Sequence, residues 1–281
     1  MSARSWQATI QAARRDPGLA VLEGVHALKH ALRFGATVLR IASPDPDALH
    51  ALLADLAPDI APDLLPDDAQ DLARDAASEV APDPRARRGD DNAIGVPVEF
   101  VDESTWDVVT GGGLPSPVLA VATRPADRID EVLAIDDGRP VILLERPRHF
   151  GNVGAAIRVA AAADAAGVVV IGSADPWHPR AIRGAAGLQF ALPVGRRDEL
   201  PTGPRTLVAV TPTGVPLGPH ALPSGAILAF GTERGGLSTG MVERADRLVR
   251  VPMRPGVSSL NLATSVAALL HGADLGGPDR A

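Results

Sequence analysis

The second half of the sequence alternates apolar segments of strand character with segments of helical periodicity. The expected strands are residues 141–144, 168–171, 190–194, 207–210, 227–230 and 248–251. The clearest helices are expected at 153–165 and 260–272. Apolar strands that alternate with helices are typical of a parallel sheet covered by helices on both faces. This part of the chain therefore predicts an α/β domain.

The first half predicts a smaller α/β unit. Its expected elements are a helix at 23–33, strands at 37–42, 96–101 and 118–122, a helix at 104–109 and a glycine turn at 111–113. Short helices broken by prolines are expected after residue 42, and a polar loop at 85–92. The prediction divides the chain into a first domain at 1–125, a linker at 126–137 and a second domain at 138–281.

Composition excludes several classes of protein. The chain of 281 residues has no cysteine, so disulfides and thiolate metal sites are impossible, and its seven histidines lack a ligand-like spacing. Neither a signal peptide nor a run of about 20 apolar residues is found, which predicts a cytoplasmic protein without a membrane partner.

Charge gives a mixed indication about nucleic acid. The net charge of −7 disfavours such a partner, because phosphate binding needs positive charge, but acidic residues concentrate at 44–79. Basic residues cluster at 85–88, 146–148, 180–183 and 196–197, and nearly all are arginine. Arginine is the better bidentate phosphate ligand, but a biased genome also explains this preference.

Three short motifs each join an expected strand end to a helix start. They are 152–158 (Asn-Val-Gly-Ala-Ala-Ile-Arg), 231–237 (Gly-Thr-Glu-Arg-Gly-Gly-Leu), and 251–253 (Val-Pro-Met) continuing to 259–261 (Ser-Leu-Asn). Strand ends of a parallel sheet meet at one edge, and open α/β sheets bind their ligands at that edge. The three motifs can therefore line one site.

Taken singly, the motifs also have structural interpretations. Asn152 can be a helix N-cap and Arg158 a solvated helix residue. Ser258 or Ser259 can cap the last helix, with Leu260 in the core. Glycine-rich turns such as 231–236 occur in many nucleotide sites, but the chain has no G-x-G-x-x-G sequence, so a dinucleotide site is not supported. Glu233 can be a first-turn acid stabilised by the helix dipole or a group that orients an arginine.

In this order the motifs resemble those of the SpoU/TrmH branch of the SPOUT methyltransferases, which methylate ribose 2'-hydroxyls in RNA. The family's pattern is matched throughout, except that Val251 stands where isoleucine is usual. Residues 179–193 are similar to the family's basic helix and the strand after it. The resemblance covers 138–274 and extends weakly to 22–24, which is similar to the start of the family's amino-terminal RNA-binding domain.

The resemblance implies an α/β fold: a C-terminal SPOUT domain with a parallel sheet and a deep trefoil knot, preceded by a smaller L30e-like α/β domain. It implies S-adenosylmethionine as co-substrate, without a metal. The donor would be held, largely by backbone groups, at Thr211, Gly231, Gly235, Val251, Pro252 and Leu260.

By the same resemblance, a ribose 2'-hydroxyl would attack the donor methyl group in line. The resemblance gives removal of the hydroxyl proton to Arg158, but a guanidinium stays protonated and is a poor base. We therefore expect Arg158 to stabilise the developing oxyanion, while an RNA phosphate or water takes the proton. The residues that would hold Arg158 and the ribose in place are Asn152, Glu233, Ser259 and Asn261.

The implied partners are ribosomal or transfer RNA and a second copy of the chain, paired through the knotted domain. The apolar face at 262–270 suits such an interface or a core equally. Aromatic residues are 3% of the chain, so platforms for base stacking are scarce; Trp177 is the one candidate that looks exposed, although the residue type favours a buried position.

Two other functions remain open. The chain can be an RNA-binding protein that keeps the fold without catalysis. It can also be a nucleotide-dependent enzyme of ordinary α/β fold that binds phosphate at 231–236.

Overall fold

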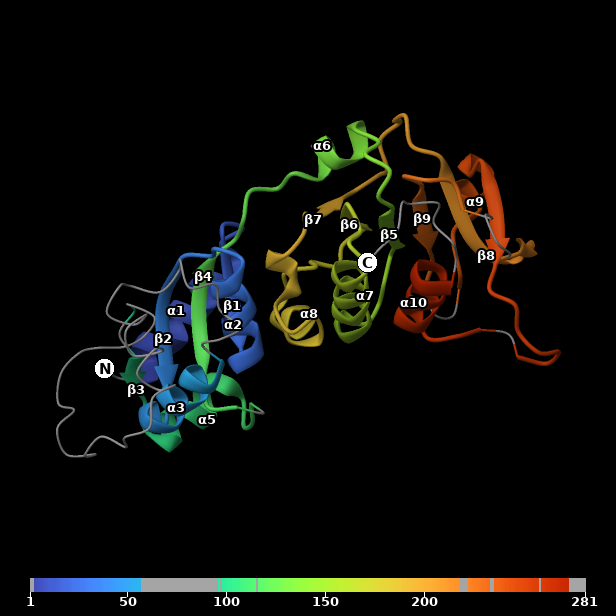
Figure 1. Ribbon diagram of the computed structural model, residues 1–281. Helices are drawn as coiled ribbons and strands as arrows, with labels where there is room; N and C mark the ends of the chain where they lie inside the picture. Colours follow the sequence, from blue (N-terminus) through green and yellow to red (C-terminus); the bar gives the residue numbers. More distant parts are fainter. Residues whose placement is uncertain are drawn as a thin grey trace, which may run out of the picture. The chain divides into compact units, whose positions relative to one another are not determined.

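The computed structural model describes residues 3–56, 96, 98–114, 116–217, 222–232, 235–257 and 259–272. The chain divides into two compact units, Met1–Pro125 and Ala126–Ala281, and each contains its own sheet (Figure 1). The expected loop at 85–92, Glu233 and Ser258 lie outside the described residues, as does most of the acidic segment.

The first unit contains a mixed four-stranded sheet. Its order is β1 (Leu19–Glu23), β4 (Leu119–Thr123), β2 (Val38–Ser43) and β3 (Val98–Phe100). Strands β1 and β2 run antiparallel to β4, and β3 runs parallel to β2. Strand β1 was not predicted, and its last residue, Glu23, was expected to begin a helix.

Helices cover this sheet, and the core lies between them. On one face Trp6 of α1 (Ala3–Arg15) and Trp106 of α5 (Glu103–Thr110) pack with Val21 and Val121 of the strands. Helices α2 (Val25–Arg33) and α3 (Pro46–Leu56) contact each other and the neighbouring strands β1 and β2. The predicted α/β character of this unit is confirmed, although helix α1 was not predicted.

The second unit contains a six-stranded sheet in which every pair is parallel. Its order is β10 (Arg247–Arg250), β8 (Leu207–Pro216), β9 (Ile227–Phe230), β5 (Val141–Glu145), β6 (Gly167–Ile171) and β7 (Val194–Arg197). The predicted parallel sheet is therefore confirmed.

The strand expected at 190–194 was placed wrongly. Gly187 has a φ of +81° and leads into a 3₁₀ turn, η3 (Leu188–Phe190), so β7 starts only at Val194. The cause is tertiary packing, because Phe190 meets Trp177 edge-on with ring centroids 5.2 Å apart. Trp177 is 6% exposed, and its indole N–H donates to the Val194 carbonyl oxygen at 3.2 Å. It is a core residue and not the exposed stacking platform.

Helices lie on both faces of the second sheet. Ile129 of α6 (Ile129–Ala134) and Met241 of α9 (Thr239–Arg244) pack in one cluster with Leu143 and Val169 of the strands. Ile142 and Leu144 alternate with these residues and are fully buried toward the opposite face. The segment at 126–137, expected as a linker, thus contributes helix α6 to the core of the second unit.

The opposite face carries α7 (Phe150–Ala162), α8 (Pro179–Gly184) and α10 (Leu262–Gly272) (Figure 1). Helix α7 contacts both α8 and α10. It approaches α8 so closely that a Cβ on Gly154 would lie 2.2 Å from the Ala181 carbonyl oxygen. Glycine is therefore required in the first motif by helix packing.

The apolar face of α10 is occupied within this unit. Leu262, Val266, Leu269 and Leu270 are all buried in the single chain. Of the two interpretations of this face, core or interface, the structure places these side chains in the core. None of the described helices is long and apolar enough to cross a membrane.

Candidate functional site

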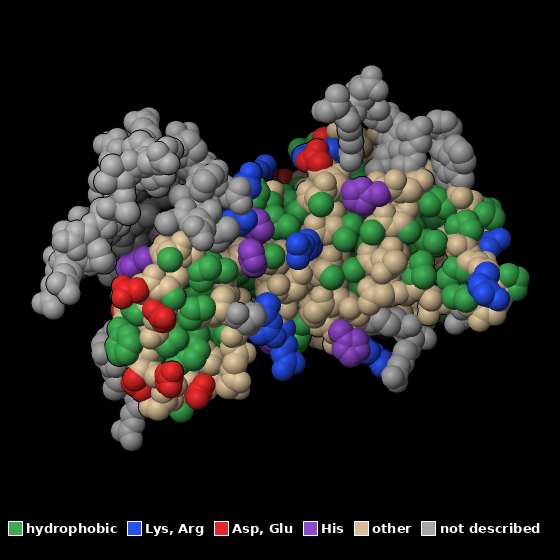
Figure 2. Space-filling model, turned by 60° about the horizontal axis from the view of Figure 1, so that its bottom comes forward, with side chains coloured by type: hydrophobic (Ala, Val, Ile, Leu, Met, Phe, Trp, Pro, Cys, Tyr) green, Lys and Arg blue, Asp and Glu red, His purple; other side chains and the backbone are tan. Residues whose placement is uncertain are grey.

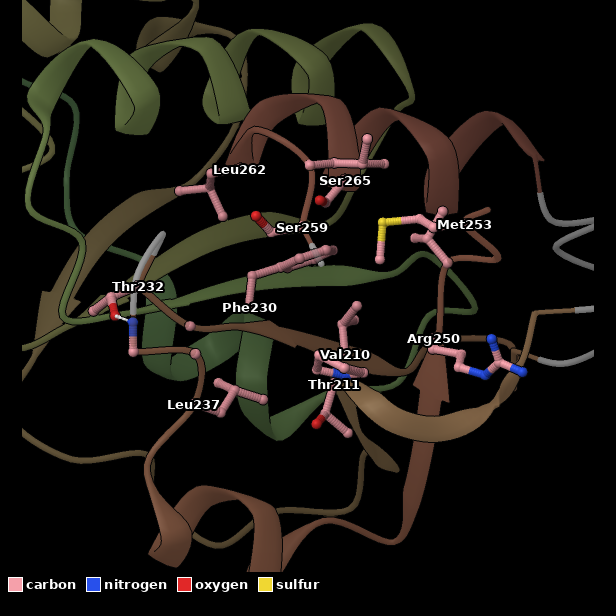
Figure 3. Close-up of a pocket in the computed structure, with 16 residues that line it drawn as sticks. Val210, Thr211, Phe230, Thr232, Leu237, Arg250, Met253, Ser259, Leu262 and Ser265 are labelled. Carbon is pink, nitrogen blue, oxygen red and sulfur yellow. Dashed lines mark hydrogen bonds between the residues drawn. The ribbon is translucent and has the colours of Figure 1, made fainter. Parts of the chain in front are cut away.

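A cavity of about 580 Å³ opens beside the ends of strands β9 and β10 and the middle of strand β8 (Figure 3). It is lined by residues 210–212 of β8, 230–232 and 235–237 around the β9 end, 250, 251 and 253 around the β10 end, 259–260, and Leu262 and Ser265 of α10. The second and third motifs therefore meet in one place, although 13 residues lie between them in sequence.

Strand β8 contributes to the cavity because part of it leaves the ladder. Ala209 pairs with Leu248 of β10, but the next β10 residue, Val249, pairs with Val215. Residues 210–214 are thus looped out between two paired ends. Gly214 lets the chain return, since a Cβ there would lie 2.4 Å from the backbone of Val249.

The glycine-rich segment after β9 folds into a closed loop. Thr232 and Gly236 exchange two backbone hydrogen bonds of 3.0 Å, and the Gly235 N–H donates to Thr232 Oγ1 at 2.9 Å. A Cβ on Gly231 would lie 2.0–2.1 Å from Gly236 and from the Leu237 nitrogen. Gly231 is therefore required because the loop closes directly over it.

The third motif ends at the cap of α10. The Asn261 side-chain oxygen accepts from the Ala263 N–H at 2.9 Å, and its backbone carbonyl accepts from the Ser265 N–H at 2.9 Å. Asn261, rather than Ser259, is thus the residue that caps this helix. The expectation that Leu260 belongs to the core was wrong, because it is 38% exposed and lines the cavity.

The first and third motifs touch through two asparagines. Asn261 Nδ2 donates to Asn152 Oδ1 at 3.2 Å across 109 residues of sequence. The N-cap interpretation of Asn152 was wrong, because α7 begins earlier and His149 occupies the cap. The Asn152 N–H already donates to the His149 carbonyl oxygen, which leaves its side chain directed to another element.

Arg158 lies apart from this cluster. It is exposed on α7 and is not among the residues that line the cavity. Six residues separate it from Asn152, which is about 9 Å along a helix. Of the other predicted residues, Thr211, Gly231, Gly235, Val251, Ser259 and Leu260 line the cavity, and Pro252 is exposed beside it. Glu233 lies outside the described residues.

The cavity wall is mostly uncharged. Among the described lining residues Arg250 carries the one formal charge, and its guanidinium points away from the centre of the cavity (Figure 3). Sequence reasoning missed the apolar side chains of Phe230, Leu237 and Leu262, which lie around the cavity. Among the described residues no group of His, Cys, Asp and Glu is placed to hold a metal ion. Such a wall suits an organic ligand held by backbone groups and apolar contacts.

Sequence reasoning also missed Glu145. It ends β5 and is 5% exposed, and it accepts two short hydrogen bonds from Ser238, the residue after the glycine-rich loop. One signal was present in the sequence, since a glutamate ends an otherwise apolar strand.

The fold and the cavity define a class: an α/β domain with a small-molecule site at the carboxyl ends of a parallel sheet. A model of the SpoU rRNA Methylase family matches residues 139–271. The chain belongs to this family.

Two curated relatives are similar in sequence. A 23S rRNA (uridine(2479)-2'-O)-methyltransferase of Streptomyces viridochromogenes is 32% identical over 171 residues, 56% of this chain and 59% of the relative. A 23S rRNA (adenosine(1067)-2'-O)-methyltransferase of Streptomyces azureus is 30% identical over 191 residues, 63% of this chain and 69% of the relative. The aligned region thus spans about six tenths of the first relative's length and somewhat more of the second.

One solved structure has the same fold over most of the chain. The SpoU methyltransferase AviRb from Streptomyces viridochromogenes, in complex with the cofactor AdoMet, aligns with a TM-score of 0.67 and 23% identity. The alignment covers 96% of this chain and 95% of that chain.

Proposed function

We propose that this chain is an S-adenosylmethionine-dependent methyltransferase that acts on a ribose 2'-hydroxyl of ribosomal or transfer RNA. Family membership and the named activity of the relatives support this function. The observation that carries it is the cavity, because the second and third motifs form its wall and the first motif is tied to it through Asn152 and Asn261.

The donor binds in this cavity. Backbone groups at Thr211, Gly231, Val251 and Leu260 hold its polar edges, with Gly235 and Pro252 shaping the wall. The apolar lining accommodates an adenine ring, and a volume of about 580 Å³ falls within the range of small-molecule sites. When bound, the donor supplies the methyl group that its sulfonium sulfur carries. The carbon–sulfur bond breaks, and the rest of the donor leaves as a neutral thioether. No metal takes part.

The chain's own residues orient the acceptor and stabilise charge. As the 2'-oxygen attacks the methyl carbon it loses its proton to an RNA phosphate or to water, and negative charge develops on the oxygen. Arg158 stabilises that charge as a guanidinium, since it cannot serve as a base near neutral pH. Asn152, Ser259 and Asn261, together with Glu233, position the ribose.

Exposed arginines of the second unit support an RNA partner. Arg146, Arg148, Arg158, Arg180 and Arg183 are all exposed, on or near helices α7 and α8. Figure 2 shows acidic side chains gathered on the surface of the first unit, at the left of the view. RNA phosphates are therefore held mainly by the second unit, while the first unit, an L30e-like domain, recognises RNA shape.

The proposal includes a knotted, dimeric second domain at work in the cytoplasm. Parallel pairing of β10 with β8 and the return of α10 onto α7 support a trefoil knot in the chain after β8. Because Arg158 lies outside the cavity of its own chain, a second copy paired through the knotted domain is needed to complete the site.

Binding of small molecules tests the proposal directly. Isothermal calorimetry should detect S-adenosylmethionine at micromolar concentration and neither ATP nor NAD at the same concentrations. Preferential binding of ATP would instead indicate a nucleotide-dependent enzyme, and donor binding without methyl transfer to total RNA would indicate an RNA-binding protein that has lost catalysis.

A further inference from the structure

Glu145 is a buried carboxylate at the end of β5 that does not line the cavity and has no part in the proposed chemistry. It is 5% exposed, and both of its oxygens accept from one residue. Oε2 accepts the Ser238 N–H at 2.7 Å, and Oε1 accepts the Ser238 hydroxyl at 2.6 Å. A carboxylate is costly to bury unless such bonds compensate it, so the pair is a specific arrangement.

Ser238 relays this interaction into a helix. Its Oγ accepts the Met241 N–H at 3.2 Å and caps α9, while its hydroxyl hydrogen is committed to Glu145. The carboxylate thus sets the direction of the hydroxyl, and the lone pair of that hydroxyl faces the helix. Glu145 therefore fixes both the backbone and the side chain of Ser238.

The geometry of the loop follows from two adjacent residues of β5. Leu144 pairs with Phe230, the last residue of β9, and Glu145 binds Ser238. The described residues of this loop, 231–232 and 235–237, thus lie between a strand end that pairs with residue 144 and a serine that is bound by the side chain of residue 145. Five of the described residues in this loop, Gly231, Thr232, Gly235, Gly236 and Leu237, line the cavity.

We infer that Glu145 is a positioning residue for methyl-donor binding: through Ser238 it holds the glycine-rich loop in its closed form before the donor arrives. The inference rests on the proposed function. A loop released at Ser238 must be ordered by the donor at the moment of binding, and donor affinity falls by that ordering cost. The chemical step, once the donor is bound, is unchanged.

Glu145→Gln tests the inference with an isosteric change. Its amide oxygen can still accept from the Ser238 N–H, but its NH₂ then donates to Ser238 Oγ, so the hydroxyl hydrogen loses its acceptor and both contacts lose the negative charge of the carboxylate. We expect the Kd for S-adenosylmethionine to rise about tenfold in calorimetry. The KM for the donor should rise equally, while kcat at saturating donor and the KM for RNA stay within about twofold. Loss of general stability would instead change the melting temperature and RNA binding.

Two further variants isolate the path of the effect. Ser238→Ala should weaken donor binding about as much as Glu145→Gln, and the double variant should bind no more weakly than the weaker single one. Glu243→Gln makes the same chemical change at an exposed position of α9 and should bind the donor as the unmodified chain does.

The inference would be overturned if Glu145→Gln bound the donor as tightly as the unmodified chain does. It would also be overturned if the fold-increase in Kd of the double variant equalled the product of the increases of the two single variants. If Glu145→Gln does not fold, Ser238→Ala provides the test, and unchanged donor affinity of that variant overturns the inference. No donor binding by the unmodified chain would overturn the proposed function itself, which separates the two failures.

Discussion

At the scale of single residues, the site depends on glycines whose role is to let backbone approach backbone. Gly231 makes room for the loop that closes over it, and Gly154 makes room for helix α8. Neither residue needs to touch the donor. The pattern of glycines in the motifs thus reflects packing of the cavity wall as much as contact with a ligand.

Gly231→Ala should weaken donor binding without unfolding the chain. The added Cβ would lie 2.0 Å from the Gly236 carbonyl carbon, so the loop has to open. We expect the Kd for S-adenosylmethionine to rise at least about tenfold in calorimetry, since clashes of this kind cost about 1–3 kcal/mol. Gly240→Ala is the matched control, because a Cβ there meets nothing within 4 Å. Equal affinities for the two variants would contradict the role of Gly231.

Arg158→Ala should separate catalysis from donor binding. Arg158 does not line the cavity, so donor affinity should stay unchanged. Removal of a charge that stabilises the transition state should lower kcat about 10²–10³-fold in a tritiated-methyl assay on RNA. Arg128→Ala, at the exposed residue just before α6, should keep full activity. Full activity of Arg158→Ala would exclude Arg158 from the reaction.

At the scale of elements, the sequence predicted the regular parts of the second unit well. Apart from Glu145 at the end of β5, strands β5, β6 and β9 consist of uninterrupted apolar residues, and their positions follow from local pattern. The looped-out part of β8 could not be predicted, because its register depends on pairing with β10 more than thirty residues later. The turn before β7 was missed for a similar reason, since Trp177 holds Phe190 there.

The same contrast holds for the site. The motif residues were found, but the partners that hold them were not: Asn152 meets Asn261, and Ser238 meets Glu145, at separations of 109 and 93 residues. Such contacts leave no periodicity in the sequence. Only the arrangement of the sheet brings these residues together.

The cap of α10 offers a test of how the first and third motifs are joined. Asn261→Asp keeps an oxygen that accepts the Ala263 N–H but loses the Nδ2 donor to Asn152. We expect its stability to be unchanged and its methyl transfer to fall severalfold. Asn261→Ala should lose the cap as well, at about 1 kcal/mol of stability. Thermal melting and the methyl assay measure the two effects, and an active Asn261→Asp variant would show that the link is structural only.

The N-cap of α5 predicts a pH dependence for the first unit. Hydrogen bonds from Ser104, then from the Thr105 backbone and side chain, lower the pKa of Asp102 to about 2. Because this pKa is depressed in the folded state, the contribution of the carboxylate is fully present above the ordinary aspartate pKa of about 3.9. It is lost as the pH falls from there toward 2.

The difference in melting temperature between the unmodified chain and Asp102→Asn, followed over pH, measures this contribution. The other carboxylates titrate in the same way in both proteins, so their effects cancel in the difference. The advantage of the unmodified chain should be constant near neutral pH and should shrink as the pH falls below about 4. An advantage that does not change over this acidic range would contradict the assigned cause.

At the scale of the whole molecule, two α/β units divide the proposed work. The family match and the cavity both belong to the second unit, within residues 139–271. The first unit has its own sheet and core, as an independent domain requires. Selection among RNA targets is therefore expected to lie with the first unit and methyl transfer with the second.

The central claim is tested most directly by the chemical nature of the product. The purified protein is incubated with isotopically labelled S-adenosylmethionine and RNA from cells that lack its gene, and the digested nucleosides are identified by mass spectrometry. We predict the label in a 2'-O-methylribonucleoside at a discrete RNA position. Label on a nucleobase, or no transfer by a protein that binds the donor, would contradict the claim.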